Sequence, residues 1–112
     1  MTTPVHTRAD VLERLAAAED EIRGLGVGRL ALFGSFARSE ARAQSDVDLL
    51  VEFAPAQKSF DAFMRLYDLL EDRLGRRVEL VTTESLSPYI GPRILVEAED
   101  VVRVQSPSPL RA

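Results

Sequence analysis

The order of its predicted strands and helices assigns this chain to the α/β or α+β class. Short apolar runs alternate with longer segments in which apolar residues recur every three or four positions, the pattern of a sheet packed against amphipathic helices. A length of 112 residues suffices for one domain with a single core, and 46% apolar with 29% charged residues is ordinary for a globular protein. We expect one domain over residues 1–104 and a disordered tail over 105–112, which holds Pro107 and Pro109.

The first part of the chain predicts a helix followed by a strand. Residues 8–24 show helical spacing of apolar side chains, and Thr7 with Asp10 suits a capping box. Residues 29–33 form a short apolar run that we interpret as a buried strand. Beyond the next turn, residues 36–41 are expected to form one helical turn.

The middle of the chain predicts a second strand and a long helix. Val47 to Phe53 is an apolar strand that Pro55 ends. Ser59 suits the N-cap of a helix over residues 60–74, and Gly75 suits its C′ position. The residues expected to face the core from this helix are Phe60, Phe63, Tyr67, Leu70 and Leu74. Met64 and Leu66 are expected to lie beside this stripe.

The last part predicts a third strand, an interrupted helix and a fourth strand. Residues 77–82 form the third strand and residues 101–104 the fourth. Residues 85–98 contain two prolines and a glycine, so we expect a broken helix whose regular part begins near Pro92. Three arginines lie near the end of the long helix, where we expect them to interact with its dipole: Arg73, Arg76 and Arg77.

The most informative residues lie between the first two predicted strands. Gly34 and Ser35 follow the first strand, and Asp46 and Asp48 stand at the beginning of the second, eleven residues after the serine. Glycine lets the backbone approach a phosphate closely, and turn amides can form an anion-binding nest. Carboxylates two residues apart on a strand share one face at about 6.6 Å spacing, and their oxygens suit Mg²⁺.

This block resembles the nucleotidyltransferase superfamily, with its Gly-Ser, spacer, Asp-x-Asp signature. More narrowly it resembles the minimal nucleotidyltransferase (MNT) domains, the MntA-type antitoxins of MNT–HEPN toxin–antitoxin systems. The similarity runs from Gly26 to Val104, and its specific parts are residues 34–51 and 76–81. It implies the nucleotidyltransferase fold, a small mixed sheet of about four strands packed with helices. It also implies Mg²⁺-dependent transfer of AMP from ATP to a tyrosine of a cognate HEPN toxin ribonuclease, which neutralises the toxin.

The same resemblance assigns catalytic and metal-binding roles to three carboxylates. Asp46 and Asp48 would hold two Mg²⁺ ions. Glu79, inside the apolar run of the third strand, would ligate the ion that activates the hydroxyl, or act as the base. The family usually has aspartate where this chain has Glu79, so this carboxylate reaches one methylene further.

On the phosphate side, Gly34 and Ser35 are expected to hold the polyphosphate, and Arg38 to neutralise phosphate charge or to meet an acidic partner surface. Arg42 is better interpreted as part of a solvated helix face. Ser39 stands where the family motif often has glycine, which predicts a stiffer loop or a shifted left-handed residue.

Composition narrows the partners and the setting. A formal net charge of −4 argues against direct nucleic-acid binding, which usually needs a basic surface. The chain has no cysteine, so it cannot form disulfides or thiolate zinc sites. Its first six residues lack the pattern of a secretory signal, and no apolar run approaches a membrane span. We expect a cytoplasmic protein in a hetero-oligomer with its toxin, and an exposed His6 in a mobile N-terminus.

Two alternatives stay open at this point. The chain would be a non-catalytic antitoxin that masks its partner by binding, if Ser39 and Glu79 mark lost activity. It would be a small-molecule nucleotidyltransferase of the aminoglycoside-modifying kind, if a dimer supplied an acceptor pocket. The short region after Glu79 argues against the second alternative. The sequence does not determine the nucleotide base, so ATP follows from the family resemblance alone.

Overall fold

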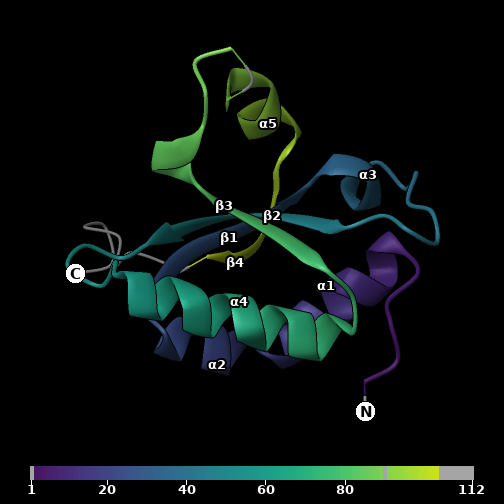
Figure 1. Ribbon diagram of the computed structural model, residues 1–112, viewed down its shortest axis with the longest axis horizontal. Helices are drawn as coiled ribbons and strands as arrows, with labels where there is room; N and C mark the ends of the chain where they lie inside the picture. The colour runs from purple at the N-terminus through teal and green to yellow at the C-terminus, as the bar shows by residue number, and fades with distance from the viewer. Residues whose placement is uncertain (1, 90, 104–112) are drawn as a thin grey trace, which may run out of the picture.

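A four-stranded mixed sheet with helices on both faces forms the body of the protein (Figure 1). The computed structural model describes residues 2–89 and 91–103. The predicted fold class is therefore confirmed, whereas the predicted tail over 105–112 lies outside the described residues. In chain order the elements are α1 (Arg8–Ala17), α2 (Glu19–Gly24), β1 (Val27–Phe33), α3 (Gly34–Ala37), β2 (Val47–Phe53), α4 (Phe60–Leu74), β3 (Val78–Thr82), the 3₁₀ turn η1 (Thr83–Ser85), α5 (Gly91–Glu97) and β4 (Glu99–Arg103).

The strand order is β3-β2-β1-β4. The strand β1 pairs antiparallel with β2 and β4, whereas β2 and β3 run parallel. A parallel pair needs a crossover connection, and α4 supplies it. Helices α1, α2 and α4 lie on one side of the sheet, and α5 lies on the other (Figure 1).

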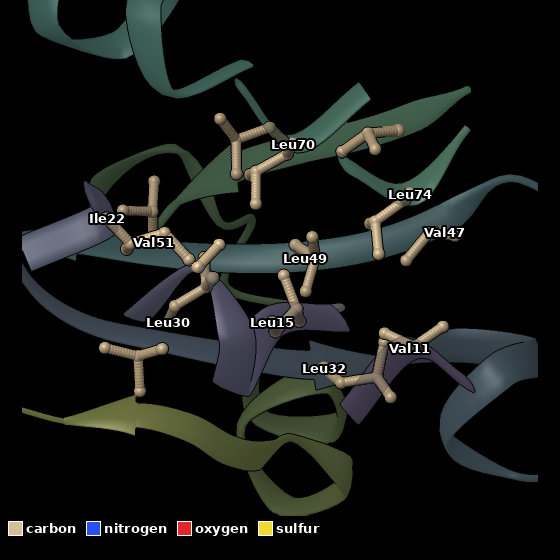
Figure 2. Packing of buried hydrophobic residues seen from close by; sticks show 14 of the residues in the cluster. Val11, Leu15, Ile22, Leu30, Leu32, Val47, Leu49, Val51, Leu70 and Leu74 are labelled. Atoms are coloured by element: carbon tan, nitrogen blue, oxygen red, sulfur yellow. The ribbon is translucent and has the colours of Figure 1, made fainter. Parts of the chain in front are cut away.

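The main hydrophobic core fills the space between the sheet and helices α1, α2 and α4 (Figure 2). Because side chains alternate along a strand, every second residue of β2 and β3 enters this core, as does every second residue of β1 after the register shift between Val27 and Arg29. Burying so many aliphatic side chains, at about 1.5–3 kcal/mol each, makes this layer the main source of folding stability. The contributions of these strands are Val27, Leu30, Leu32, Val47, Leu49, Val51, Val78 and Leu80.

The opposite face of the sheet is less fully covered. Ala31, Phe33 and Leu50 form a small second cluster there, which Ile94 of α5 and three other partly buried residues flank. By the same alternation, Asp48 and Glu79 belong to this face. The sheet therefore keeps its main core on one face, and Asp48 and Glu79 on the other.

The predicted helix over residues 8–24 is wrong as a single element, because Ala18 separates α1 from α2 with φ −101° and ψ 9°. Its sequence gives no sign of the break, since the buried residues continue with helical spacing through it: Val11, Leu15, Ala18 and Ile22. The predicted capping box is confirmed. The Thr7 hydroxyl accepts from the Asp10 amide at 3.0 Å, and the Asp10 carboxylate accepts from the Thr7 amide at 3.2 Å.

The N-terminal segment is anchored to the domain, which corrects the expectation of a mobile N-terminus. Val5 is fully buried, and its amide donates to the Leu74 carbonyl at 3.0 Å. The Val5 carbonyl in turn accepts from Arg76 Nε at 3.0 Å. His6 is exposed as expected, and its amide donates to the Asp10 carboxylate.

The long helix α4 has the predicted bounds and caps. The Ser59 hydroxyl accepts from the Ala62 amide at 3.0 Å, and Gly75 adopts φ +63°. The predicted stripe is partly wrong, because Leu66 is fully buried whereas Phe60 is 80% exposed. Phe60 lies in the first turn, where it borders a shallow hollow of about 350 Å³ instead of the core.

Other element boundaries differ from the predictions by a few residues. The strand β3 begins at Val78 and β4 at Glu99, whereas α5 begins at Gly91, close to the predicted start. The helical turn after β1 begins already at Gly34, so that Arg38 is its C-cap. The described ranges contain no helix long and apolar enough for a bilayer.

Ser39 adopts the left-handed conformation, with φ +59°. A side chain there is strained by about 1 kcal/mol relative to glycine. We expect Ser39→Gly to raise the unfolding midpoint by about 4 °C or more, measured by calorimetry. Ala37→Gly, inside the helical turn α3, is the control and should lower the midpoint. A lower midpoint for Ser39→Gly would contradict the expectation.

Candidate active site

The candidate site lies where the end of β1 meets β2 and β3 on the sheet face that carries α5. Strand register places Phe33 opposite Asp48, and Asp48 opposite Glu79. Neighbouring strands are about 4.8 Å apart. The turn after β1 and the two carboxylates therefore form one row across three strands, although Gly34 and Glu79 are 45 positions apart in sequence.

Gly34 is the point at which the turn touches the carboxylates. It adopts φ +74°, and a Cβ atom added to it would lie 2.8 Å from Asp48 Cγ and nearer still to Oδ2. No other residue type fits both this conformation and this space. The group that the Gly34 backbone approaches in this structure is Asp48, and the predicted approach to a phosphate stays a prediction.

The three predicted carboxylates lie close enough to influence one another. Asp48 is half-buried, Asp46 immediately precedes β2, and Glu79 is exposed on β3. Burial, followed by the interaction with Glu79 and the charge of Asp46, raises the pKa of Asp48 to about 7, although the charge of Arg38 partly opposes the rise. The ionised form of Asp48 is therefore disfavoured unless a nearby positive charge compensates it.

The chemistry of these donors fits a divalent cation. Within the described ranges, no three His, Cys, Asp or Glu side chains are arranged to hold a metal by themselves. Mg²⁺ seldom needs such a cage, since it usually binds one or two carboxylates together with substrate phosphates. The raised pKa of Asp48 has the same cause that would make a cation favourable there, namely adjacent carboxylates in a partly desolvated position.

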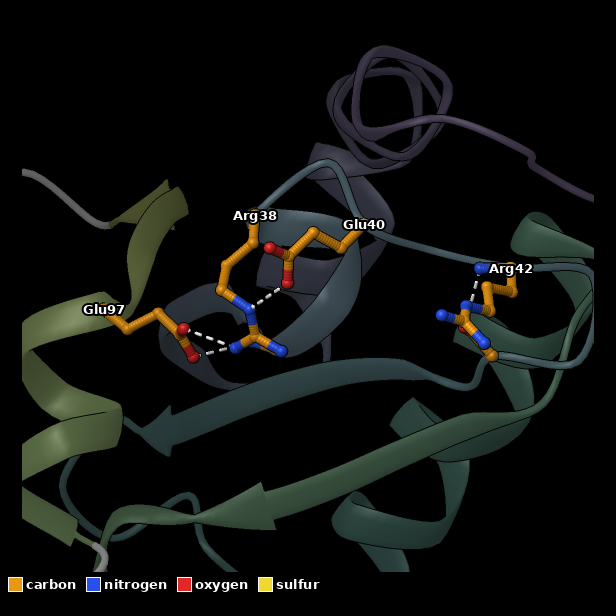
Figure 3. A network of polar contacts seen from close by, with 6 residues as sticks. Arg38, Glu40, Arg42 and Glu97 are labelled. Carbon is orange, nitrogen blue, oxygen red and sulfur yellow. Dashed lines mark hydrogen bonds and ion pairs between the residues drawn. The ribbon is translucent and has the colours of Figure 1, made fainter.

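On the phosphate side of the row, Arg38 is held by two carboxylates (Figure 3). Its Nε donates to Glu40 at 2.8 Å, and its Nη1 donates to Glu97 at 2.5 Å. Ser35 is half-buried in α3, and its carbonyl accepts from the Glu40 amide. Arg42 lies apart from the Arg38–Glu97 pair (Figure 3), and its amide donates to the Ser45 hydroxyl at 2.8 Å.

Glu97, at the end of α5, reaches the predicted phosphate-binding turn. Its Oε2 accepts from the Gly34 amide at 3.0 Å. The hydrogen bond from Arg38, followed by that from Gly34, lowers the pKa of Glu97. Glu97, Arg38 and Gly34 also line an open cavity of about 630 Å³, together with Phe33, Tyr89, Arg93 and Ile94.

Comparison with known proteins identifies the family. The profile of the nucleotidyltransferase domain matches residues 12–101, which is most of the chain. The chain belongs to this family. The nucleotidyltransferase domain is also 39% identical over 92 residues to the protein adenylyltransferase MntA of Thermococcus cleftensis, a match that covers 81% of this chain and 92% of that protein. The predicted family resemblance is thereby confirmed.

Solved structures agree with this assignment. A protein assigned as a minimal nucleotidyltransferase superposes with a TM-score of 0.65 and 38% identity, over 79% of this chain and 93% of that one. A tri-AMPylated HEPN toxin of Shewanella oneidensis, in complex with its MNT antitoxin, gives a match with a TM-score of 0.53 and 21% identity, over 80% of this chain and 72% of the other. At that identity the second match establishes the fold alone.

Two residues beside the site of this nucleotidyltransferase domain escaped the sequence reasoning. Glu97 escaped it because α5 follows Gly34 by more than fifty positions, and its one signal was an acid at the end of an apolar helical run. The sequence predicts that Arg76 interacts with the dipole of the long helix. Its Nη1 instead donates to the carbonyls of Arg42, Ala43 and Ser45 at 2.9–3.2 Å.

Arg76 therefore stabilises the loop that precedes β2 and contains Asp46. Its guanidinium also lies 5.3 Å from the centre of the Phe36 ring, in the turn that follows β1. One arginine thus connects both segments of the Gly-Ser and Asp-x-Asp signature. We regard Arg76 as a positioning residue for Asp46.

Proposed function

We propose that this nucleotidyltransferase domain transfers AMP from ATP to a tyrosine of a cognate HEPN toxin and so neutralises the toxin. The observation that carries the proposal is the contact of Gly34 with Asp48, with Glu79 in register on the next strand. The turn that we expect to bind phosphate is thus adjacent to the carboxylates, an arrangement that nucleotidyl transfer requires. The adenylyltransferase name of the MntA relative supports the choice of reaction, and the fold shared with the antitoxin of the AMPylated Shewanella toxin agrees with it.

The carboxylates would hold the divalent cations of the reaction. Asp46 and Asp48 provide oxygen ligands from the beginning of β2, and Glu79 provides a third from β3. Bound Mg²⁺, with two ions expected, would neutralise triphosphate charge and favour ionisation of the acceptor hydroxyl. Glu79 also lies on an exposed part of the sheet, where an acceptor brought by a partner can reach it.

The turn after β1 would hold the polyphosphate. The Gly34 amide and the Ser35 amide and hydroxyl are donors for phosphate oxygens, and the Arg38 guanidinium adds a fixed positive charge. Catalysis would then consist mainly of positioning and charge neutralisation around the departing pyrophosphate. The choice of ATP follows from family likeness, since no described residue is known to recognise the nucleotide base.

The acceptor would come from the partner protein. The site face of the sheet is covered only in part, and its Glu79 end is exposed. A cognate toxin in a hetero-oligomer would place its tyrosine there. A cytoplasmic setting is part of this proposal, because the substrate ATP and an RNA-cleaving partner are both found there.

The test is intact mass spectrometry of the purified partner after incubation with ATP, Mg²⁺ and this protein. We expect the partner to gain AMP, and the gain to vanish with Asp46→Asn. Asp61→Asn is the matched control, because Asp61 is an exposed residue of α4 that pairs with Arg65, away from the site. Parallel reactions with GTP and CTP determine the specificity for the nucleotide base. Tight binding of the partner without a gain of mass would replace the proposal with masking by contact.

A further inference from the structure

The carboxylate of Glu97 occupies the donors that the proposed function gives to a phosphate. Its Oε2 accepts from the Gly34 amide at 3.0 Å, and its Oε1 accepts from Arg38 Nη1 at 2.5 Å. Glu97 is 63 residues away from Gly34 and belongs to a helix on the site face of the sheet. An anion supplied by the chain itself therefore lies at the turn.

A carboxylate and a phosphate group compete for the same kind of donor. Both are oxyanions that accept charge-assisted hydrogen bonds from a guanidinium and from backbone amides. Arg38 is also paired with Glu40, so its guanidinium already interacts with two carboxylates, through Nε and Nη1 (Figure 3). A triphosphate that approaches the Gly34 amide meets a donor that is already bonded.

We propose that Glu97 takes the place of a phosphate group in the nucleotide-free protein, and that a triphosphate binds at Gly34 and Arg38 only by displacing it. The identity of the displacing ligand rests on the proposed function. The hydrogen bonds of the Glu97 carboxylate to the two donors are independent of that function. Glu97 thereby lowers the affinity for the nucleotide, because it competes with a phosphate for the same two donors.

An ordinary surface ion pair would not have these properties. The Glu97 side chain is only 28% exposed, compared with 48% for Arg38. The bond to the Gly34 amide is a second, independent contact, and it fixes the orientation of the carboxylate. In a simple surface ion pair, the carboxylate would contact the guanidinium alone.

The structure also provides a place for Glu97 after displacement. Arg93, one turn earlier on α5, lines the same cavity of about 630 Å³ and lies close enough for its charge to act on Glu97. Ile94 keeps α5 packed on the second hydrophobic cluster. A movement of the Glu97 side chain toward Arg93 would free both donors while α5 remains on the sheet.

The experiment compares the affinity of Glu97→Ala and of wild type for inorganic tripolyphosphate and for a non-hydrolysable ATP analogue with Mg²⁺, by calorimetry on the whole chain. We expect binding to tighten about tenfold, the equivalent of one charge-assisted hydrogen bond. Glu40→Gln is the matched control, since it removes the other carboxylate from Arg38 and leaves the Gly34 amide bonded. It should tighten binding less than Glu97→Ala does.

A second readout follows the Gly34 amide by nitrogen–proton NMR. Tripolyphosphate should shift this resonance in wild type, and Glu97→Ala should shift it before any ligand is added. Glu97→Gln, which keeps the shape of the side chain, carries the test if the alanine variant does not fold. Equal affinities in wild type and both variants would overturn the role of Glu97 and leave the proposed function standing. Absence of binding in all three would overturn both.

Discussion

Asp48→Asn is expected to abolish nucleotidyl transfer and, at the same time, to stabilise the metal-free protein. Loss of a carboxylate that holds the cation removes several kcal/mol of transition-state stabilisation, so transfer should fall by about 10³-fold or more. The gain in stability has a separate cause. Ionised Asp48 lies half-buried beside Glu79 and Asp46, and asparagine relieves that repulsion.

The stability gain should depend on pH in a defined direction. The pKa of Asp48 rises from 3.8 in the unfolded chain to about 7 in the folded protein. The protonated carboxyl is therefore favoured by folding, and its contribution is fully present below pH 4 and lost as the pH rises through 7. After allowance for solvent screening of a half-buried group, the loss in wild type is about 1–2 kcal/mol at pH 8.

The measurement is thermal unfolding of both proteins between pH 5 and pH 8, with a chelator present. The difference in midpoint between Asp48→Asn and wild type should widen as the pH rises. Asp61→Asn, at an exposed position on α4, should show no such widening. A difference that narrows toward pH 8, or transfer that survives in Asp48→Asn, would show that Asp48 is not the acidic centre of the site.

Gly34→Ala is expected to damage both the fold and the site. Alanine is strained at φ +74°, and its Cβ would overlap the Asp48 carboxylate. Relief requires a shift of the turn or of β2 beneath it, which we estimate at about 2–4 kcal/mol of folding free energy. Because the turn would move away from the carboxylates, tripolyphosphate and ATP binding should fall below detection.

Chemical denaturation and calorimetric titration measure the two effects separately. Gly24→Ala is the control, because Gly24 ends α2 and a Cβ there would meet nothing within 4 Å. It should keep wild-type ligand binding and gain slightly in stability. Wild-type binding by a folded Gly34→Ala protein would mean that the turn is not the phosphate site.

Local signals in the sequence predicted most of the fold. The bounds of α4 follow from a capping serine and a left-handed glycine, each of which acts on its own neighbours. The break at Ala18 could not be predicted, since apolar residues keep their helical spacing through it. Phe60 matched the stripe by spacing, but it borders a hollow that Phe53 and Thr82 also line, and spacing does not report such an arrangement.

The residues of the candidate site were likewise predictable only in part. The Gly-Ser and Asp-x-Asp pattern indicated Gly34, Asp46 and Asp48, and an acid within an apolar strand indicated Glu79. Strand register then placed Asp48 beside Glu79, an arrangement that a sequence pattern can suggest but not measure. Contacts made across the fold by Glu97 and Arg76 depend on three-dimensional packing, so no spacing rule could find them.

The separation of the two sheet faces has a consequence for protein engineering. Side chains between the sheet and α1, α2 and α4 form the main core, whereas those beneath α5 border the proposed site. A mutant library confined to residues 86–97 would therefore sample altered ligand or partner preference on a scaffold that still folds. Randomising Leu49 or Leu70 in the opposite layer would instead yield mostly insoluble clones.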